Sequence, residues 1–163
     1  MQIVFAKRWE SRPSADLVAI PFWKGEKGAI LACDEAEIPQ LPQAAGEDFS
    51  GDKGQFCTLY NNDAPEPRIV LMGLGKVDEV TPETVRAAYA ALTHLCREKK
   101  LQKLNIAVPQ VAKQELAGAL VEGICLANYA YSQRKIKKGT KEKTILTNCT
   151  LIGCSAASQK AAV

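Results

Sequence analysis

Apolar residues along this chain fall into short runs separated by glycine, proline and charged residues, as in proteins that alternate strands and helices. Residues 2–6 and 16–23 are two such runs, and the second ends at a charged stretch, 24–28, that ends in glycine. This length and these boundaries predict two strands and a turn. Residues 29–46 have a mixed pattern that contains two prolines, so we expect a short helix and a loop there.

A hairpin of two strands is predicted next. Residues 54–60 alternate in side-chain character, residues 61–67 are rich in turn formers, and residues 68–72 resume a strand-like run. Residues 69–72 are apolar at every position rather than at every second one. This pattern predicts a central strand that is buried on both faces.

A helix is predicted to begin at Thr81. Thr81 can accept a hydrogen bond from a free amide of the first turn, Pro82 has no amide hydrogen to leave unpaired, and Glu83 suits the positive end of the helix dipole. Apolar residues then recur every three or four positions as far as Leu95, so one helix face is apolar. Residues 103–108 alternate as in a strand.

A second helix is predicted from about residue 111 or 112, and it is apolar on nearly every side as far as Tyr131. We therefore expect it to pack against a sheet and against another element. Gly118 and Gly123 each cost about 1 kcal/mol relative to alanine within a helix, so a close backbone approach is expected there. Residues 144–152 are rich in β-branched residues and predict a last strand. The order of elements predicts an α/β fold: a mixed β-sheet with helices packed on its faces and right-handed crossovers.

The composition agrees with a single globular domain. Of the 163 residues, 47% are hydrophobic and 24% are charged, which is close to the average for globular proteins. No stretch approaches the roughly 20 apolar residues of a membrane-spanning helix, and the first residues lack the apolar core of a signal peptide. These features predict a cytoplasmic protein that does not contact a membrane.

Six cysteines and one histidine limit the chemistry of this chain. The cysteines are spread through apolar segments without a CxxC pair, so buried reduced thiols are expected rather than disulfides or a zinc site. A nucleophile would need a base, and His94 lies off the apolar stripe of its helix with no obvious acidic partner. We therefore expect no catalytic residue, no metal ligand and no cofactor in this chain.

The net charge of +3 is unevenly distributed. Residues 134–143 contain six basic residues against one glutamate, a local charge of +5, so the rest of the chain carries −2. A solvated loop is the favoured interpretation, because this stretch lacks the aromatic residues that stack on single-stranded nucleic acid. The alternative is DNA binding through this basic loop. Its candidate contacts are Arg134, Lys135, Lys137 and Lys138.

One phosphate-loop candidate, residues 73–76 (GLGK), follows the buried strand, where open α/β sheets bind ligands. A dinucleotide-binding fingerprint would need a third glycine in place of Asp78, and a Walker loop would need Ser or Thr in place of Val77. Turn glycines without a ligand are therefore favoured. The alternative is a nucleotide-binding loop whose ligand-binding residues are Gly73, Gly75 and Lys76.

Several short motifs, in order and at matching spacing, resemble the N-terminal domain of the leucyl aminopeptidase family, also called cytosol aminopeptidases. Each motif is modest by itself, and their shared order carries the resemblance. The segments are 49–55 (like the family's F-x-G-x-x-G turn), 70–76 (like its VGLGK strand end), 81–83 with 86–88, and 122–123 with 129–131 (like its EG…L-x-x-Y-x-F).

The resemblance implies a fold similar to macro domains and a function that depends on a larger protein. Members of the family remove N-terminal residues from peptides with two divalent metals, typically zinc or manganese, which are bound by a C-terminal domain in motifs such as NTDAEGR. No such motif occurs in this chain. We therefore expect residues 1–153 to form the N-terminal α/β domain and residues 154–163 to begin a linker toward a catalytic domain that is absent here.

The function expected from the resemblance is that of a non-catalytic domain of a leucyl aminopeptidase. Family members assemble as hexamers with their N-terminal domains outward, so the expected partners are the chain's own catalytic domain and other subunits. The expected roles are oligomer assembly and access to the active sites. A free-standing macro-type module that binds ADP-ribose or a related nucleotide is the alternative from a different class.

Overall fold

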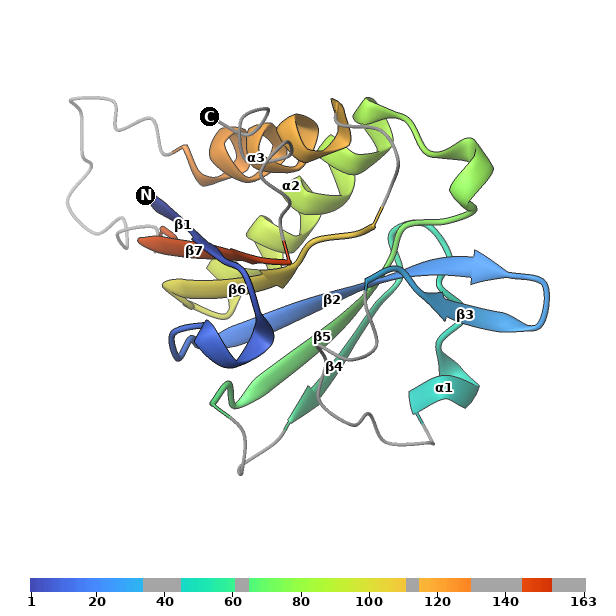
Figure 1. Ribbon diagram of the computed structural model, residues 1–163, viewed down its shortest axis with the longest axis horizontal. Coiled ribbons are helices and arrows are strands. Elements are labelled where there is room, and N and C mark those ends of the chain that lie inside the picture. The colour runs from blue at the N-terminus through green and yellow to red at the C-terminus, as the bar shows by residue number, and fades with distance from the viewer. Residues whose placement is uncertain (34–44, 61–64, 111–114, 130–144, 154–163) are drawn as a thin grey trace, which may run out of the picture.

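The computed structural model describes residues 1–33, 45–60, 65–110, 115–129 and 145–153 (Figure 1). The strands are β1 (Gln2–Ala6), β2 (Leu17–Gly25), β3 (Gly28–Leu31), β4 (Phe56–Tyr60), β5 (Arg68–Gly73), β6 (Lys103–Ala107) and β7 (Asn148–Ile152). The helices are α1 (Ala45–Asp48), α2 (Pro82–Glu98) and α3 (Glu115–Asn128), with 3-10 turns η1 (Trp9–Ser11) and η3 (Val77–Glu79).

One mixed sheet organises the molecule. Its strand order is β1-β7-β6-β2-β5-β4, and β3 pairs with the far end of β2. The neighbours β1, β7, β6, β2 and β5 are parallel to one another, whereas β4 is antiparallel to β5 and β3 is antiparallel to β2. The predicted α/β class with a mixed sheet and packed helices is confirmed.

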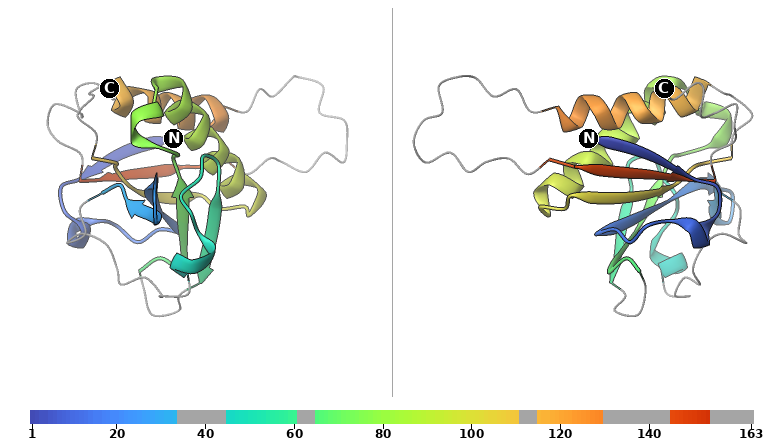
Figure 2. Two further views of the ribbon diagram at one scale, coloured as in Figure 1. Left: turned by 90° about the vertical axis from the view of Figure 1, so that its right-hand side faces the viewer. Right: turned by 60° about the vertical axis from the view of Figure 1, so that its left-hand side comes forward.

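Both long helices cover the same face of the sheet (Figure 2). Alternate residues of each central strand point to this face: Leu17 and Ala19 of β2 join the core beneath the helices, whereas Val18 and Ile20 join the core of the opposite face. The crossovers from β5 through α2 to β6 and from β6 through α3 to β7 step in the same direction across the sheet. Connections of one handedness therefore place both helices on one side. On the opposite face, Trp9 and Phe49 cover the strands.

Helix α2 begins as predicted. The Thr84 amide donates to Thr81 Oγ1 at 3.2 Å, and the Thr81 amide donates to Thr84 Oγ1 at 2.9 Å, so both residues cap the first turn. Its predicted apolar face is buried, with Tyr89 and Leu92 fully inaccessible. Helix α3 packs along α2, and the two backbones lie close together at Gly123: a Cβ on Gly123 would lie 2.4 Å from the Arg86 carbonyl oxygen.

Three local predictions need correction. Residues 28–31 form strand β3, where a helix and a loop were expected, because this segment folds back on β2 through the tight turn after Gly25. Helix α3 packs against α2 and joins the core on the sheet, as expected, but part of its apolar surface is uncovered: Leu126 near its end is 68% exposed, and Tyr129 just after it is 70% exposed. The last strand is shorter than predicted and begins at Asn148.

Other predictions fall partly outside the described residues. These include the start of α3, the predicted linker 154–163 and most of the 29–46 segment. In the described part of the chain, no helix has the length and apolar character needed to span a membrane.

The cysteines do not share one environment, contrary to the expectation of six buried thiols. Cys96 and Cys149 are buried, Cys125 is exposed, and Cys33 and Cys57 are half-buried. Burial raises the pKa of the Cys96 thiol to about 12, with a smaller contribution from the negative charge of Asp16. Burial likewise raises the pKa of the Cys149 thiol.

Candidate functional site

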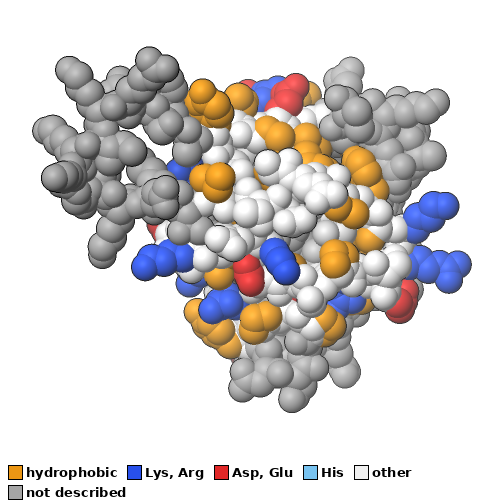
Figure 3. Space-filling view, turned by 90° about the vertical axis from the view of Figure 1, so that its left-hand side faces the viewer, with side chains coloured by type: hydrophobic (Ala, Val, Ile, Leu, Met, Phe, Trp, Pro, Cys, Tyr) orange, Lys and Arg blue, Asp and Glu red, His pale blue; other side chains and the backbone are white. Residues whose placement is uncertain are grey.

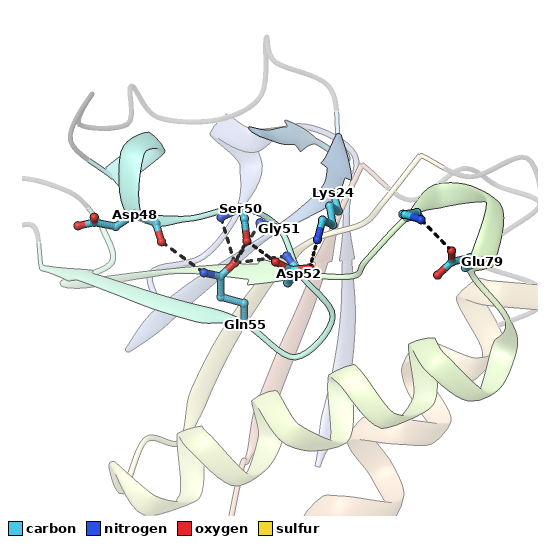
Figure 4. Close-up of polar contacts among 8 residues, drawn as sticks. Lys24, Asp48, Ser50, Gly51, Asp52, Gln55 and Glu79 are labelled. Atoms are coloured by element: carbon cyan, nitrogen blue, oxygen red, sulfur yellow. Dashed lines mark hydrogen bonds and ion pairs between the residues drawn. The ribbon is translucent and has the colours of Figure 1, made fainter. Parts of the chain in front are cut away.

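The candidate site is the polar turn 49–55 where it meets the carboxyl ends of β2 and β5 (Figure 4). This edge of a parallel sheet is where α/β proteins bind ligands. Phe49 anchors the turn, because it is 2% exposed and packs edge-on against Phe22 of β2, with ring centroids 5.3 Å apart. The turn therefore has a fixed position above the strand ends.

Backbone hydrogen bonds join the turn to the predicted phosphate loop. The Gly73 amide donates to the Gln55 carbonyl oxygen at 2.8 Å, and the Gly75 amide donates to the Gly51 carbonyl oxygen at 3.1 Å. Between them, the Leu74 amide donates to the Phe22 carbonyl oxygen at 2.9 Å. All three amides that would cradle a phosphate thus already bond to protein oxygens.

Close packing explains the glycines at this junction. A Cβ on Gly73 would lie 2.0 Å from the Asp52 carbonyl oxygen, which is far below any real contact distance. Gly51 has a φ of +77°, and a Cβ there would lie 2.6 Å from the Trp23 carbonyl oxygen. Glycine is therefore required where the turn crosses the end of the sheet.

The Gln55 side chain occupies the centre of the turn. Its Oε1 accepts hydrogen bonds from the amides of Ser50, Gly51 and Asp52 at 3.0, 3.1 and 3.3 Å. Its Nε2 donates to the Asp48 carbonyl oxygen at 3.3 Å. Successive amides that point into one concavity often bind anions, but here the side-chain oxygen of Gln55 occupies it.

The charged groups of the site pair with one another. Lys24 Nζ lies 2.6 Å from Asp52 Oδ1, and Ser50 Oγ donates to Asp52 Oδ2 at 2.6 Å. These two hydrogen bonds, the one from Lys24 first, lower the pKa of the Asp52 carboxyl. Lys76 Nζ lies 3.2 Å from Glu79 Oε1. Both ion pairs are largely exposed, so each contributes little to stability.

These contacts describe a clamp that fastens a turn to the sheet and offers no ready cradle for a ligand. Gly73, Gly75 and Lys76 do lie together, as the GLGK motif predicted, but their contacts do not support the nucleotide-binding alternative. We refer to residues 49–55 and 73–76 with Lys24 as the strand-end clamp. The roles of Lys24 and Gln55 were not predicted from the sequence: Lys24 meets Asp52 only in the folded chain, and the bonds of Gln55 depend on the conformation of the turn.

A two-metal centre does not fit the described residues. No three His, Cys, Asp or Glu side chains come together in the described ranges; Asp52 of the clamp already bonds to Lys24 and Ser50, and Glu79 beside it pairs with Lys76. His94 is exposed on α2, as expected. The candidate DNA-contacting residues Arg134, Lys135, Lys137 and Lys138 lie outside the described residues.

A second polar cluster, unforeseen from the sequence, lies under the opposite face of the sheet. Arg12 Nε and Nη2 donate to Glu66 Oε1 and Oε2 at 2.7 and 3.0 Å, and Asn105 Nδ2 donates to Glu66 Oε1 at 2.7 Å. The Arg12 guanidinium also lies 4.1 Å from the centre of the Trp9 ring. With side chains 8% and 1% exposed, Arg12 and Glu66 form a buried ion pair that links η1 to the segment before β5.

Curated relatives of known sequence match most of this chain. It is 32% identical over 151 residues to a probable cytosol aminopeptidase of Protochlamydia amoebophila, a match covering 90% of this chain and 30% of the relative. It is 36% identical over 130 residues to a probable cytosol aminopeptidase of Chlamydia trachomatis serovar D, covering 76% and 26%. The chain thus spans less than a third of the length of these relatives.

Solved structures and a family model agree with these matches. A mutant of tomato leucine aminopeptidase superposes with a TM-score of 0.69 at 18% identity, covering 99% of this chain and 34% of that one. The bottromycin maturation enzyme BotP in complex with Mn superposes with a TM-score of 0.62 at 20% identity, covering 91% and 28%. At these identities the superpositions show the fold. The family model described as "Cytosol aminopeptidase family, N-terminal domain" matches residues 35–138.

Proposed function

The chain belongs to the cytosol aminopeptidase family, and we propose that it acts as the non-catalytic N-terminal domain of a longer metallo-aminopeptidase. The observation that carries the proposal is the match to the family's N-terminal domain, together with the small fraction of each relative that this chain spans. The strand-end clamp supports it, because its polar groups bond to one another.

The chemistry of the proposed parent protein would be supplied by a different domain. That domain would bind two divalent metals, zinc or manganese, that activate water and polarise the scissile carbonyl of an N-terminal residue, preferentially leucine. The present chain would position that domain within a cytoplasmic hexamer and shape the approach to its active sites. It would do so as a rigid body, since its turn, sheet and helices are tied by buried contacts.

A chimera tests this proposal. The chain is fused in place of the matching N-terminal part of the Protochlamydia amoebophila relative, and hydrolysis of leucyl-p-nitroanilide and oligomer mass are measured. We expect an assembled, active enzyme. Two variants of the chimera are compared. The test variant carries Gly73→Ala, which should disturb the clamp, and the matched control carries Gly54→Ala, whose added Cβ meets no atom within 4 Å.

Activity and assembly should be retained by the Gly54→Ala chimera and reduced by Gly73→Ala. A chimera that folds, as judged by circular dichroism, yet neither assembles nor hydrolyses the substrate would contradict the proposal. A relative whose catalytic domain is equally active and assembled without any N-terminal domain would also contradict it.

A further inference from the structure

Basic side chains gather at the edge of the sheet where its parallel strands begin, at the other end of the strands from the strand-end clamp. We call this group the basic edge, and it consists of Arg68, Lys99, Lys100 and Lys103. Lys99 and Lys100 follow the last turn of α2, whereas Arg68 and Lys103 begin β5 and β6. The three lysines are exposed and Arg68 is half-buried. Figure 3 looks onto this side of the molecule and shows Lys and Arg side chains spread over it.

Asp16 joins the two strand starts of the basic edge. Its Oδ2 accepts hydrogen bonds from the amides of Gln102 and Lys103 at 2.8 and 2.9 Å, and its own amide donates to the Lys103 carbonyl oxygen at 3.0 Å. Its carbonyl oxygen accepts from Arg68 Nη1 at 3.4 Å. Arg68 and Lys103 are therefore held on one surface, on strands two spacings apart in the sheet, or about 10 Å.

The positive charge of the basic edge is not balanced by nearby carboxylates. The ion pairs of the described residues use other basic side chains: Arg12, Lys24, Lys76 and Arg86. Near the edge lie Asp16, whose carboxylate bonds to backbone amides, and Glu98, which is exposed. With Arg97 the edge has five basic residues against these two acids, a net charge of +3. Lysines after a helix suit the negative end of its dipole, but Arg68 and Lys103 lie at the starts of strands.

An exposed tyrosine borders the basic edge. Tyr60 ends β4, lies opposite Arg68 in the β4–β5 pairing, and is 69% exposed. Tyrosine and arginine are enriched where proteins bind one another. Proteins that bind single-stranded nucleic acid instead place aromatic rings along the strand, so that successive bases stack on them. Because Tyr60 lies at one end of the row of cations, the arrangement favours a polypeptide as the partner.

We infer that the basic edge and Tyr60 form a docking surface for an acidic segment of a partner protein. Carboxylates of the segment pair with the cations of the edge, and an apolar residue beside them packs on the Tyr60 ring. An extended chain rises about 3.3 Å per residue, so a run of roughly four acidic residues spans the distance between Arg68 and Lys103. This inference goes beyond the proposed function, which does not require such a partner.

The exposure of the basic edge predicts binding that is weak and sensitive to salt. An exposed ion pair contributes at most about 1 kcal/mol, and salt screens it. We therefore expect a dissociation constant on the order of 100 μM at low ionic strength. Raising the salt from about 20 mM to about 200 mM should weaken binding at least fivefold, because the Debye length shortens to less than the span of the edge.

Fluorescence anisotropy with the whole chain tests this inference. The probe is a fluorescein-labelled peptide of one leucine followed by six glutamates, compared with the same peptide containing glutamines and with a short labelled DNA duplex. The test variant is Lys99→Gln/Lys103→Gln. The matched control is Lys27→Gln/Lys53→Gln, which removes the same charge from two exposed lysines at the carboxyl ends of the strands. Circular dichroism checks that both variants are folded.

The glutamate peptide should bind the wild-type chain and the glutamine peptide should not. Its dissociation constant should rise about fivefold for Lys99→Gln/Lys103→Gln and stay within about twofold for Lys27→Gln/Lys53→Gln, since only the first pair of lysines contacts the peptide. No binding by the wild-type chain, or equal affinities of the two variants, would overturn the inference. Tighter binding of the DNA duplex than of the glutamate peptide would also overturn it, because the edge would then be a nucleic-acid surface.

Discussion

Gly73 is held as glycine by its neighbours rather than by an unusual backbone conformation. The turn 49–55 crosses directly over it, and the nearest carbonyl oxygen, that of Asp52, occupies the space of a side chain. Gly73→Ala must therefore push the turn away from β5, which we expect to cost about 2–3 kcal/mol of unfolding free energy. Urea denaturation followed by tryptophan fluorescence measures this loss.

The control for this prediction is Gly54→Ala, in the same turn. Gly54 has a φ of +80°, but a Cβ there meets nothing within 4 Å. Gly54→Ala should therefore lower the unfolding free energy only through backbone strain, by about 1 kcal/mol. Equal losses of unfolding free energy in the two variants would contradict close packing at Gly73.

The buried ion pair between Arg12 and Glu66 allows a second prediction at this scale. Glu66→Ala leaves the Arg12 guanidinium buried without a counter-charge, so we expect a loss of about 3–5 kcal/mol by chemical denaturation. Lys24→Ala breaks the exposed pair with Asp52 and should cost less than about 1 kcal/mol. A Glu66→Ala variant as stable as Lys24→Ala would contradict this assignment.

The buried thiol of Cys96 predicts how stability depends on pH. Its pKa is raised from 9.0 to about 12 in the folded protein, so above pH 9 the unfolded chain loses this proton first and is favoured. The contribution of Cys96 to stability is complete below pH 9 and declines between about 9 and 12. Denaturation midpoints measured across this range should fall less steeply for Cys96→Val than for wild type.

The matched control is Cys125→Ser, which alters an exposed thiol. Its pH profile should parallel that of the wild type. If the denaturation midpoint fell less steeply with pH for Cys125→Ser than for Cys96→Val, the Cys96 thiol would be accessible to solvent. The sequence did not separate these two cysteines, because both lie in apolar helical patterns and only the packing of α2 and α3 decides which of them reaches solvent.

Elements with strong local signals were predicted well from the sequence. The start of α2 follows from the Thr81-Pro82 pair, and the buried strand β5 follows from its unbroken apolar run. Strand β3 was missed because four residues after a glycine carry little periodicity, and its stability depends on pairing with β2. The exposed apolar side chains of α3 were missed for a similar reason, since periodicity does not say which apolar face remains uncovered.

The crossing of α2 and α3 yields a prediction at the scale of elements. Gly123→Ala should improve helix propensity by about 1 kcal/mol, but its Cβ would lie 2.4 Å from the Arg86 carbonyl oxygen and force the helices apart. We expect a net loss of about 1–2 kcal/mol in thermal or urea unfolding. A stabilised Gly123→Ala protein would be inconsistent with the close approach described above.

The arrangement of the whole molecule was only partly accessible from the sequence. The mixed sheet follows from the order of strands and helices, but the pairing of β1 with β7, from opposite ends of the chain, has no local signal. The same holds for the strand-end clamp. The sequence contained both the FSGDKGQ turn and the GLGK segment, yet their backbone contacts depend on β2 lying beside β5 and on the β4–β5 hairpin.

A non-catalytic domain should have no peptidase activity of its own, which is measured by assaying the purified chain for leucyl-p-nitroanilide hydrolysis in the presence of manganese or zinc. We expect a hydrolysis rate equal to that of the metal-only control at every protein concentration. Release of p-nitroaniline that increases in proportion to the amount of chain, and that disappears with a chelator, would contradict it.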